Sequence, residues 1–524
     1  EIPRPYAPGP IAPEAQAKFF NLRSEADYLM ASLIPVLLAT LLSIPMQIFT
    51  NSIHSMLPFR AMGYDDNGAL AEDSLCLSRT SNLIVAPKIA VRFIRRFRDP
   101  LPLLVLILSL GSMVLVPLSS EVIRLEFSPV ECVRNDTLCA YGLRKSALPL
   151  RAAEGLLVFT TILVLGLGVI LFRWRSGVAA EPWSIASMAS LLSGSQPQLR
   201  DLMRSLPPCV DGAYLRGGQI SKVLDGQLFK LGYQGPESVN CGIGIVINNA
   251  PTLDDNISIR LTVRDPPQRQ GAIQPAKPRR HIPPPRTIEM LIQVTALILT
   301  VGLLILILLY ENIIWGRGNG FEAFMDSQSF GVRILFTSFG TAVSAFWDYH
   351  FSNISESRIY QRLSAAAGSS QTARHSILLS PPLSVFTAAA SGLWRPSVYN
   401  TKNKNDVLYL NISLAAVLAK FTPILFSGIP FRNTVTWKMH EASTWTAVAV
   451  LSYMVLVLAV SLLSSRNRVY MPVKADSVAG CMYYVCDSVM LKDFEGLAAV
   501  RQKERDKLVA EMVRTYVFGE GLGV

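Results

Sequence analysis

One uninterrupted apolar stretch constrains this chain more than any other feature. Residues 290–310 contain no charged residue, and only Gln293, Thr295 and Thr300 carry a strongly polar side chain. A bilayer hydrocarbon core about 30 Å thick is crossed by roughly 20 apolar residues in a helix. Because lipid offers no hydrogen-bond partners, such a stretch has to satisfy its own backbone groups as an α-helix. The chain is therefore predicted to be a membrane protein.

The charges around this stretch predict its orientation. Lys277, Arg279, Arg280 and Arg286 precede it, whereas residues 311–326 hold no comparable basic cluster. Lys and Arg are enriched in cytoplasmic loops, so the amino end of this helix is expected in the cytoplasm. The same bias accounts for the net charge of +11, because the basic residues stand in short loops beside apolar spans. Nucleic-acid binding is therefore not expected.

The same rule, applied along the chain, predicts an all-α polytopic membrane protein with about seven transmembrane helices. The predicted spans cover residues 28–50, 101–118, 155–172, 286–312, 332–350, 408–428 and 442–463. Basic and less basic loops alternate between these spans without contradiction. Residues 1–27 are predicted to be a Pro-rich arm outside the cytoplasm, and residues 498–524 a charged cytoplasmic helix.

The predicted spans fall into two copies of a three-helix unit, residues 28–206 and 331–497, with the central helix 286–312 linking them. Sparse identities align the copies at one fixed offset. The aligned pairs are Thr40 with Thr341, Ser43 with Ser344, Ile53 with Ile354, and the unlike pair Leu57 with Arg358. Because the first span of each copy runs from outside to inside, the repeats are predicted to be parallel. This disfavours the inverted repeats of many transporters, although parallel repeats also occur in transporters.

The linker at residues 207–285 is predicted to be cytoplasmic and to contain a β-hairpin. Residues 242–248 and 257–263 alternate apolar and other side chains with period two, and a turn-rich segment separates them. The segment is short and rich in proline towards its end, which argues against a large independent core.

The loop at residues 119–154 is predicted to lie outside the cytoplasm. It contains Cys132, Cys139 and a glycosylation sequon at Asn135. Disulfides persist outside the cytoplasm, so Cys132 and Cys139 are candidates for a disulfide and Asn135 for glycosylation. The alternative is two free thiols in a buried loop.

Two further segments have interfacial character. Residues 84–97 interleave apolar and basic side chains, which is typical of an amphipathic helix at the membrane surface or of a solvated basic loop. Residues 469–497 contain Cys481 and Cys486 beside an apolar helical stripe. Juxtamembrane cysteines are common acylation sites, so both are candidates for acylation. The alternative is that this stripe packs against the cytoplasmic ends of the spans.

The sequence contains no motif that predicts a reaction. The five histidines show no metal-binding spacing, and no phosphate-binding loop or nucleophile elbow occurs. No catalytic residue, cofactor or metal site is expected.

Lys420 is the exceptional charge within a predicted span, about midway through residues 408–428. A charged side chain at this depth costs about 3 kcal/mol and usually faces a partner or a wet cavity. Asp348 and Asn411 are candidate partners, and Lys420 and Asp348 are the candidate intramembrane functional charges. The alternatives are a lysine that extends to the membrane surface or a span that is shifted in the bilayer.

Several motifs together resemble those of a known family. They are 346–348 (FWD), 376–381 (SILLSP), 420–425 (KFTPIL), 471–472 (MP), 479–488 (AGCMYYVCDS) and 491–496 (LKDFEG). The chain resembles a fungal family of multi-span membrane proteins with tandem copies of a domain of unknown function. Some members are named for hypersensitivity to calcofluor, a cell-wall dye. The resemblance is stronger over residues 332–497 than over the first copy. It implies a link to the cell surface, and it supplies neither a reaction nor catalytic residues.

Two function classes follow. The first is a non-enzymatic membrane scaffold or regulator of the fungal cell surface or endomembranes, linked to cell-wall integrity. It would contact the lipid bilayer and bind protein partners through its cytoplasmic loops, with the plasma membrane favoured over endomembranes. The second is a transporter or channel with Lys420 in its translocation path. Sparse intramembrane charge and parallel repeats favour the first.

Overall fold

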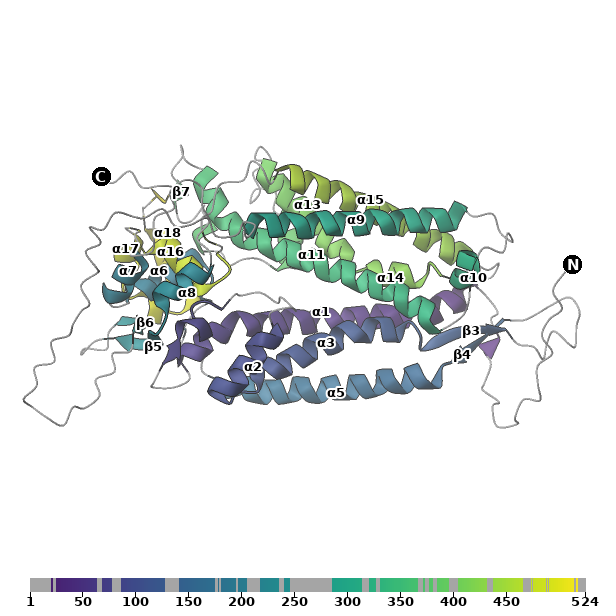
Figure 1. Ribbon diagram of the computed structural model, residues 1–524, viewed down its shortest axis with the longest axis horizontal. Helices are drawn as coiled ribbons and strands as arrows, with labels where there is room; N and C mark the ends of the chain where they lie inside the picture. Colours follow the sequence, from purple (N-terminus) through teal and green to yellow (C-terminus); the bar gives the residue numbers. More distant parts are fainter. Residues whose placement is uncertain are drawn as a thin grey trace, which may run out of the picture.

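The computed structural model describes most of the chain. The described residues are 20–21, 25–63, 68–77, 86–127, 141–174, 178, 181–194, 197–204, 217–234, 240–245, 285–312, 320–326, 330–365, 371–372, 377–379, 384–394, 404–430, 437–464, 473, 475–486, 488, 490–512 and 515–516. They form a long bundle of helices with a small domain at one end (Figure 1).

The bundle consists of two groups of helices that lie one above the other in Figure 1. The first group is α1 (Glu25–Gly63), α2 (Ala86–Phe97), α3 (Leu101–Ser119) and α5 (Ala147–Phe172). The second is α9 (Pro285–Asn312), α11 (Phe330–Ala365), α12 (Val385–Trp394), α13 (Lys404–Ala419), α14 (Thr422–Ser427) and α15 (Trp437–Ser464). The short helix α10 (Gly320–Asp326) joins α9 to α11. The chain is therefore mostly helical, as predicted.

Six of the described helices are long and apolar enough to cross a membrane. They are Leu33–Gly63, Leu101–Ser119, Ala147–Phe172, Glu289–Asn312, Asp406–Ser427 and His440–Ser464. Each coincides with a predicted span. Helix α11 covers the remaining predicted span, residues 332–350, but it is not among the six, so the count of seven is not confirmed.

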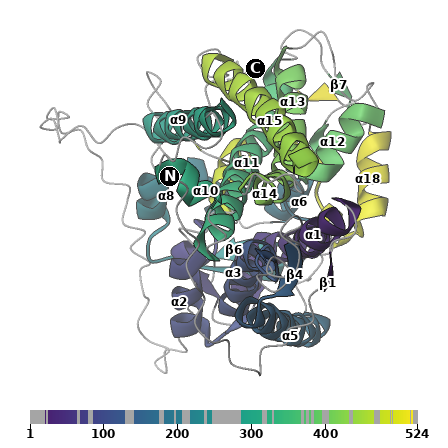
Figure 2. The ribbon, with the colours of Figure 1, turned by 90° about the vertical axis from the view of Figure 1, so that its right-hand side faces the viewer.

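The composition of α11 follows from its place in the bundle. This helix packs against α3, α13 and α14, which makes it one of the central helices in the view along the bundle (Figure 2). It therefore faces protein over much of its surface, and Thr337, Ser344 and His350 are buried on it. A helix that faces protein does not need the uniformly apolar surface of a lipid-facing helix such as α5.

Helices α1 and α11 both end later than predicted. Helix α1 continues to Gly63 and α11 to Ala365, beyond the predicted ends at residues 50 and 350. Polar residues in these extensions mark the aqueous side of the membrane but do not break a helix. As a result, Gln47 and Asp348 lie near the middle of their helices rather than near an end.

The two groups contact each other in a reciprocal way. Helix α1 packs on α3 and also reaches α14 in the other group, while α11 packs on α13 and α14 and also reaches α3. Helix α5 packs on α3, and α15 packs on α13 and α14. The short helices α2 and α12 pack on α3 and α13, respectively. Helix α9 packs on α15.

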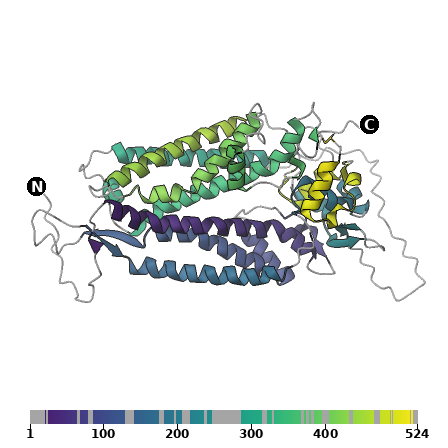
Figure 3. The same cartoon turned by 180° about the vertical axis from the view of Figure 1, so that it is seen from behind.

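The small domain lies at the end of the bundle where α1 and α11 end (Figure 3). Its helices and short turns are η1 (Ala71–Asp73), α6 (Ile185–Ser193), α7 (Pro197–Arg204), α8 (Gly217–Leu224), η2 (Ile377–Leu379), α16 (Val478–Val485), α17 (Met490–Asp493), η5 (Leu497–Ala499) and α18 (Gln502–Glu511). One hydrophobic core contains residues from all these parts of the sequence, from Phe59 to Val509. The domain is thus assembled from both halves of the chain.

A β-hairpin lies within the linker predicted at residues 207–285. Strand β6 (Asn240–Ile245) overlaps the predicted first strand, but it pairs antiparallel with β5 (Leu228–Gln234), which itself pairs with β2 (Ala69–Leu70). The predicted second strand, residues 257–263, lies outside the described residues. Only residues 235–239 separate β5 from β6, so this local pairing closes a short loop at a small entropy cost. The pairing predicted for residues 257–263 stays a prediction.

Two other small sheets complete the described structure. Strands β1 (Phe20–Asn21), β4 (Tyr141–Lys145) and β3 (Ile123–Phe127) form one antiparallel sheet at the end opposite the small domain. Strands β7 (Gln371–Thr372) and β8 (Thr515–Tyr516) form the other. The predicted charged helix at residues 498–524 corresponds to α18, which is shorter.

Candidate functional site

Lys420 stands at a break in the sixth predicted span. Helix α13 ends at Ala419 and α14 begins at Thr422, followed by Pro423. Pro423 has no N–H and cannot donate to the Ala419 carbonyl, so the helix is interrupted there. The Thr422 hydroxyl lies 2.7 Å from this carbonyl oxygen and 2.9 Å from the Gly340 carbonyl oxygen. The Thr422 side chain thereby holds the break against α11, and it supplies the Ala419 carbonyl with the donor that Pro423 lacks.

A close approach of two backbones fixes this arrangement. A Cβ atom on Gly340 would lie 2.6 Å from the Pro423 Cα, closer than real contacts allow. Only glycine therefore lets α11 and α14 meet at this depth, which is the role small residues play between membrane helices. The contact places Lys420 over the side of α11 that carries Asp348.

The Lys420 ammonium group has two partners from two different helices. Its Nζ donates a hydrogen bond to Asp348 Oδ2 on α11 and another, 2.6 Å long, to Gln47 Oε1 on α1. Lys420 is only 6% exposed, so the protein itself buries this side chain. The site therefore joins the two halves of the bundle through one buried cation.

In the predicted repeat alignment, Gln47 and Asp348 occupy corresponding positions in the two halves. They are separated by the same number of residues as the aligned pair Thr40 and Thr341. The two side chains that hold Lys420 thus come from aligned positions on α1 and α11. Lys420 itself comes from one half alone, so the site is asymmetric and holds a single lysine between these two helices.

These contacts settle where the predicted residues lie. Lys420 and Asp348 are brought together, whereas Asn411 lies apart from them: its Nδ2 donates to the Val407 carbonyl at 2.8 Å, and its Oδ1 accepts from the Tyr453 hydroxyl at 2.9 Å. Because the Lys420 ammonium group is buried and paired, the side chain does not extend to the membrane surface. A functional role for the pair stays a prediction.

Sequence reasoning did not identify Gln47 as a partner. Its amide adds no charge, so it raises no signal in a hydropathy profile. The repeat alignment contained that signal, because it places Gln47 opposite Asp348.

A second polar contact between the halves lies nearer the end of the bundle that carries β3. The hydroxyl oxygens of Ser120, just after α3, and Thr337 on α11 are 3.1 Å apart, and both residues are buried. On the same side of the structure, His440 on α15 is buried against α9. Its Nδ1 lies 2.8 Å from the Ile429 carbonyl oxygen and its Nε2 lies 3.0 Å from Glu311 Oε2. Because a carbonyl oxygen can only accept, Nδ1 carries a proton.

A buried Arg–Asp pair closes the other end of each half. Arg60 Nε on α1 lies 2.6 Å from Asp99 Oδ2, just before α3, and Arg358 Nη2 on α11 lies 3.2 Å from Asp406 Oδ1 on α13. The guanidinium groups also lie over aromatic rings, 5.1 Å from that of Trp174 and 3.9 Å from that of Tyr409, respectively. The first two spans of each half are thus connected in the same way.

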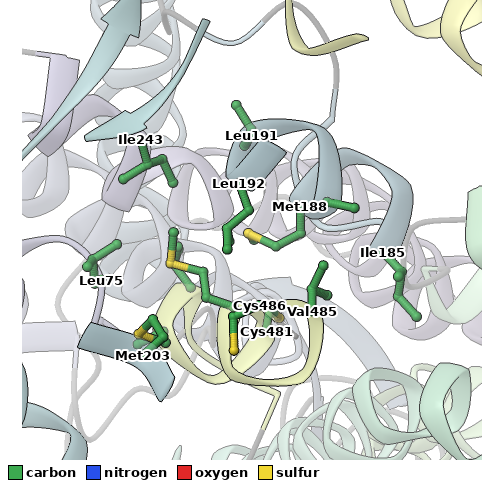
Figure 4. Close-up of a cluster of buried hydrophobic side chains, with 14 of the residues drawn as sticks. Leu75, Ile185, Met188, Leu191, Leu192, Met203, Ile243, Cys481, Val485 and Cys486 are labelled. Atoms are coloured by element: carbon green, nitrogen blue, oxygen red, sulfur yellow. The ribbon is translucent and has the colours of Figure 1, made fainter. Parts of the chain in front are cut away.

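One helix from each half, α6 and α16, meet in the core of the small domain, and each is capped by a serine. Ser184 caps α6 by accepting a hydrogen bond from the Ser187 N–H, and Ser477 caps α16 by accepting one from the Gly480 N–H, each 3.1 Å long. Helices α6 and α16 pack against each other (Figure 4). The Ala479 N–H donates to the Leu75 carbonyl at 2.8 Å, while η2 packs on α6. Each half therefore contributes a segment to the other half's helix.

The candidate acylation sites lie inside this core. Cys481 is 5% exposed and Cys486 is 3% exposed, and Figure 4 shows both among side chains of α6, α7 and β6. Their sulfur atoms lie 3.4 Å from the Ala475 and Tyr483 carbonyl oxygens, respectively. This burial favours packing over an interfacial helix, because both thiols lie inside the protein core. Acylation stays a prediction.

The remaining predicted site residues lie outside the described part of the chain. Cys132, Cys139 and Asn135 fall between β3 and β4, whose pairing of Phe127 with Tyr141 holds the two ends of this loop together. Within the described residues, no cluster of three or more His, Cys, Asp or Glu side chains could hold a metal ion.

Comparison with known proteins adds one family match. Neither the curated proteins nor the solved structures contain a match to the chain. A family model described as "Protein of unknown function (DUF3433)" matches residues 29–124, which run from α1 into β3. The match lies in the first half, whereas the residue motifs gave the stronger resemblance in the second. It supports a domain of unknown function in this chain.

Proposed function

We propose that the protein is a non-enzymatic integral membrane scaffold or regulator. The observation that carries this proposal is the engagement of Lys420 by Gln47 and Asp348 across the two halves. A buried ion pair is weak evidence for stability, but a polar contact can fix one arrangement of helices among several. Here it defines how two related helix groups associate, which is what a scaffold requires.

The proposed architecture has two parallel tandem repeats and seven spans, with α11 as the seventh. Three observations support it: the reciprocal packing of α1 with α14 and α11 with α3, the matching Arg–Asp pairs, and the exchanged segments around α6 and α16. Because its long neighbours are apolar spans, α11 has to cross the same bilayer thickness. Two repeats related by a rotation about the membrane normal would place Lys420 close to their common axis.

The small domain is the proposed binding module for cytoplasmic protein partners. Both halves of the chain build its core, so a partner that binds it senses how the halves are arranged. Helix α18 presents Lys503, Glu504 and Lys507 to solvent, whereas Arg505 is buried and donates to the Ser187 hydroxyl. Exposed charged residues on a helix that is anchored in this way suit a reversible polar interface.

The family resemblance supports a proposal about where in the cell the protein acts. From this resemblance, the proposed location is a fungal membrane, with the plasma membrane favoured over endomembranes, and the proposed role is linked to cell-wall integrity. Outside the cytoplasm, a glycan on Asn135 and a disulfide between Cys132 and Cys139 would shape the loop between β3 and β4.

The alternative is a transporter or channel with Lys420 in the translocation path. One observation favours it: the side chain of Asp348 remains 29% exposed beside a nearly inaccessible lysine. Intramembrane charge pairs of this kind occur in proton and ion pathways, and parallel repeats occur in transporters.

Two measurements on the full chain separate these functions. Liposomes that contain the purified protein and a pH- or ion-sensitive dye report flux, with Lys420→Met as the comparison. In fungal cells that lack the protein, dye tolerance is compared after rescue by the wild type or by the α18 variant Lys503→Ala/Glu504→Ala/Lys507→Ala. A scaffold gives no flux and loses rescue in the α18 variant. Flux that Lys420→Met abolishes, with full rescue by the α18 variant, supports the transporter.

A further inference from the structure

Helix α2 presents three distinct surfaces. Ala86, Ile89, Ala90 and Phe93 are buried and pack on α3. The other two surfaces are stripes with helical spacing: an exposed apolar stripe of Pro87, Val91 and Ile94, and beside it a basic stripe of Lys88, Arg92 and Arg95 with Arg96. Val91 is 47% and Ile94 38% exposed. In water, an exposed apolar stripe on a short helix is unfavourable, so this surface has a non-aqueous neighbour.

The position of α2 identifies that neighbour. The helix ends at Phe97, and α3, a membrane-spanning helix, begins at Leu101. Figure 1 shows α2 beside the start of α3, towards the end of the bundle that carries the small domain. By the positive-inside rule, the six basic residues between α1 and α3 place this end at the cytoplasmic leaflet. The apolar stripe therefore lies at the depth where acyl chains meet headgroups.

The orientation of α2 is held by more than its buried face. Arg92 Nη1 donates to the Glu72 carbonyl at 2.8 Å, and its guanidinium lies 3.5 Å from the carboxylates of both Glu72 and Asp73. This links the basic stripe to η1 in the small domain. Lys88, Arg95 and Arg96 remain exposed on the same side of the helix.

We propose that α2 binds anionic phospholipid headgroups of the cytoplasmic leaflet, with Val91 and Ile94 inserted among the acyl chains and Lys88, Arg95 and Arg96 on the phosphates. A lipid is favoured over nucleic acid or an acidic peptide because the basic residues adjoin an exposed apolar stripe beside a membrane span. The small domain, which Arg92 joins to α2, would then sense leaflet charge. This inference holds whether the protein is a scaffold or a transporter.

The test measures lipid selectivity of the full chain. Native mass spectrometry counts the lipids retained on protein from micelles that contain equal amounts of phosphatidylserine and phosphatidylcholine. The wild type is compared with Lys88→Gln/Arg95→Gln/Arg96→Gln. The matched control is Arg501→Gln/Lys503→Gln/Lys507→Gln, which removes the same charge from exposed positions on α18.

The wild type is expected to prefer phosphatidylserine. A basic residue near an anionic surface raises affinity about fivefold, so the α2 variant should lose affinity for phosphatidylserine on the order of 100-fold, and the control should change little. If the α2 variant does not fold, the wild type is measured at rising salt, where the preference should fall. An unchanged preference in the α2 variant, an equal loss in the control, or a salt-independent preference would overturn the proposal.

Discussion

Substitution of Lys420 by Met tests whether this residue's ion pair defines the association of the two halves. Methionine keeps the length of the side chain and suits an apolar environment, but it leaves Asp348 without its ammonium partner. Removal of one partner of a buried ion pair typically costs about 3–5 kcal/mol. We therefore expect Lys420→Met to cost about 3 kcal/mol or more.

Removal of both charges should restore most of the lost stability. Replacing a buried pair by apolar residues of similar volume is often neutral or stabilising. In Lys420→Met/Asp348→Leu, only the hydrogen bond of Gln47 is lost as well, and hydrogen bonds between membrane helices average about 0.6 kcal/mol. The double variant should therefore lie within about 1 kcal/mol of the wild type. Because Asp348→Leu alone leaves the buried ammonium group without its carboxylate and should also cost about 3 kcal/mol, the coupling energy between the two positions should be at least about 5 kcal/mol.

The assay is reversible unfolding of the purified protein in mixed micelles by increasing dodecyl sulfate, followed by circular dichroism. Lys503→Met, at an exposed position on α18, is the matched control and should change stability by at most about 0.5 kcal/mol. If Lys420→Met costs the same in the wild type and in the Asp348→Leu background, the two residues are not energetically coupled and the proposed association through Lys420 is wrong.

Three further predictions concern packing and thiol chemistry. Gly340→Ala forces α11 away from Pro423, so its midpoint of unfolding should drop markedly, and an unchanged midpoint contradicts the close approach. Burial raises the pKa of Cys76 to about 11, so a variant that retains only this cysteine should be alkylated slowly at pH 8 when folded and readily once unfolded. Equal rates in both states would refute this. Cys481→Ser/Cys486→Ser should carry the same acyl label as the wild type, and a loss of label would show that the core opens in cells.

The sequence alone was sufficient for the spans that face lipid. Transfer of a side chain from water to hydrocarbon depends on that side chain and its position in one helix, so a local apolar stretch such as residues 290–310 is recognised without knowledge of its neighbours. The composition of α11 alone does not identify it as such a span. It is buried by α3, α13 and α14, and its polar residues are tolerated because of those contacts.

The candidate site was accessible in part for the same reason. A lysine in an apolar span is costly wherever its partner lies, so Lys420 stood out at once. Its partners were harder to recognise. Asp348 was one of two predicted partners, and the neutral Gln47 gave no local signal.

Only the tertiary structure decided which segments meet. A strand or an apolar helix face needs a partner, but several segments of similar pattern can supply it, and the choice depends on distance and packing in the folded chain. Strand β6 pairs with β5, and the helix that contains Cys481 packs on α6. Apolar spans can be predicted from the sequence because they depend on single residues and their spacing, whereas the contacts between the two halves join residues hundreds of positions apart.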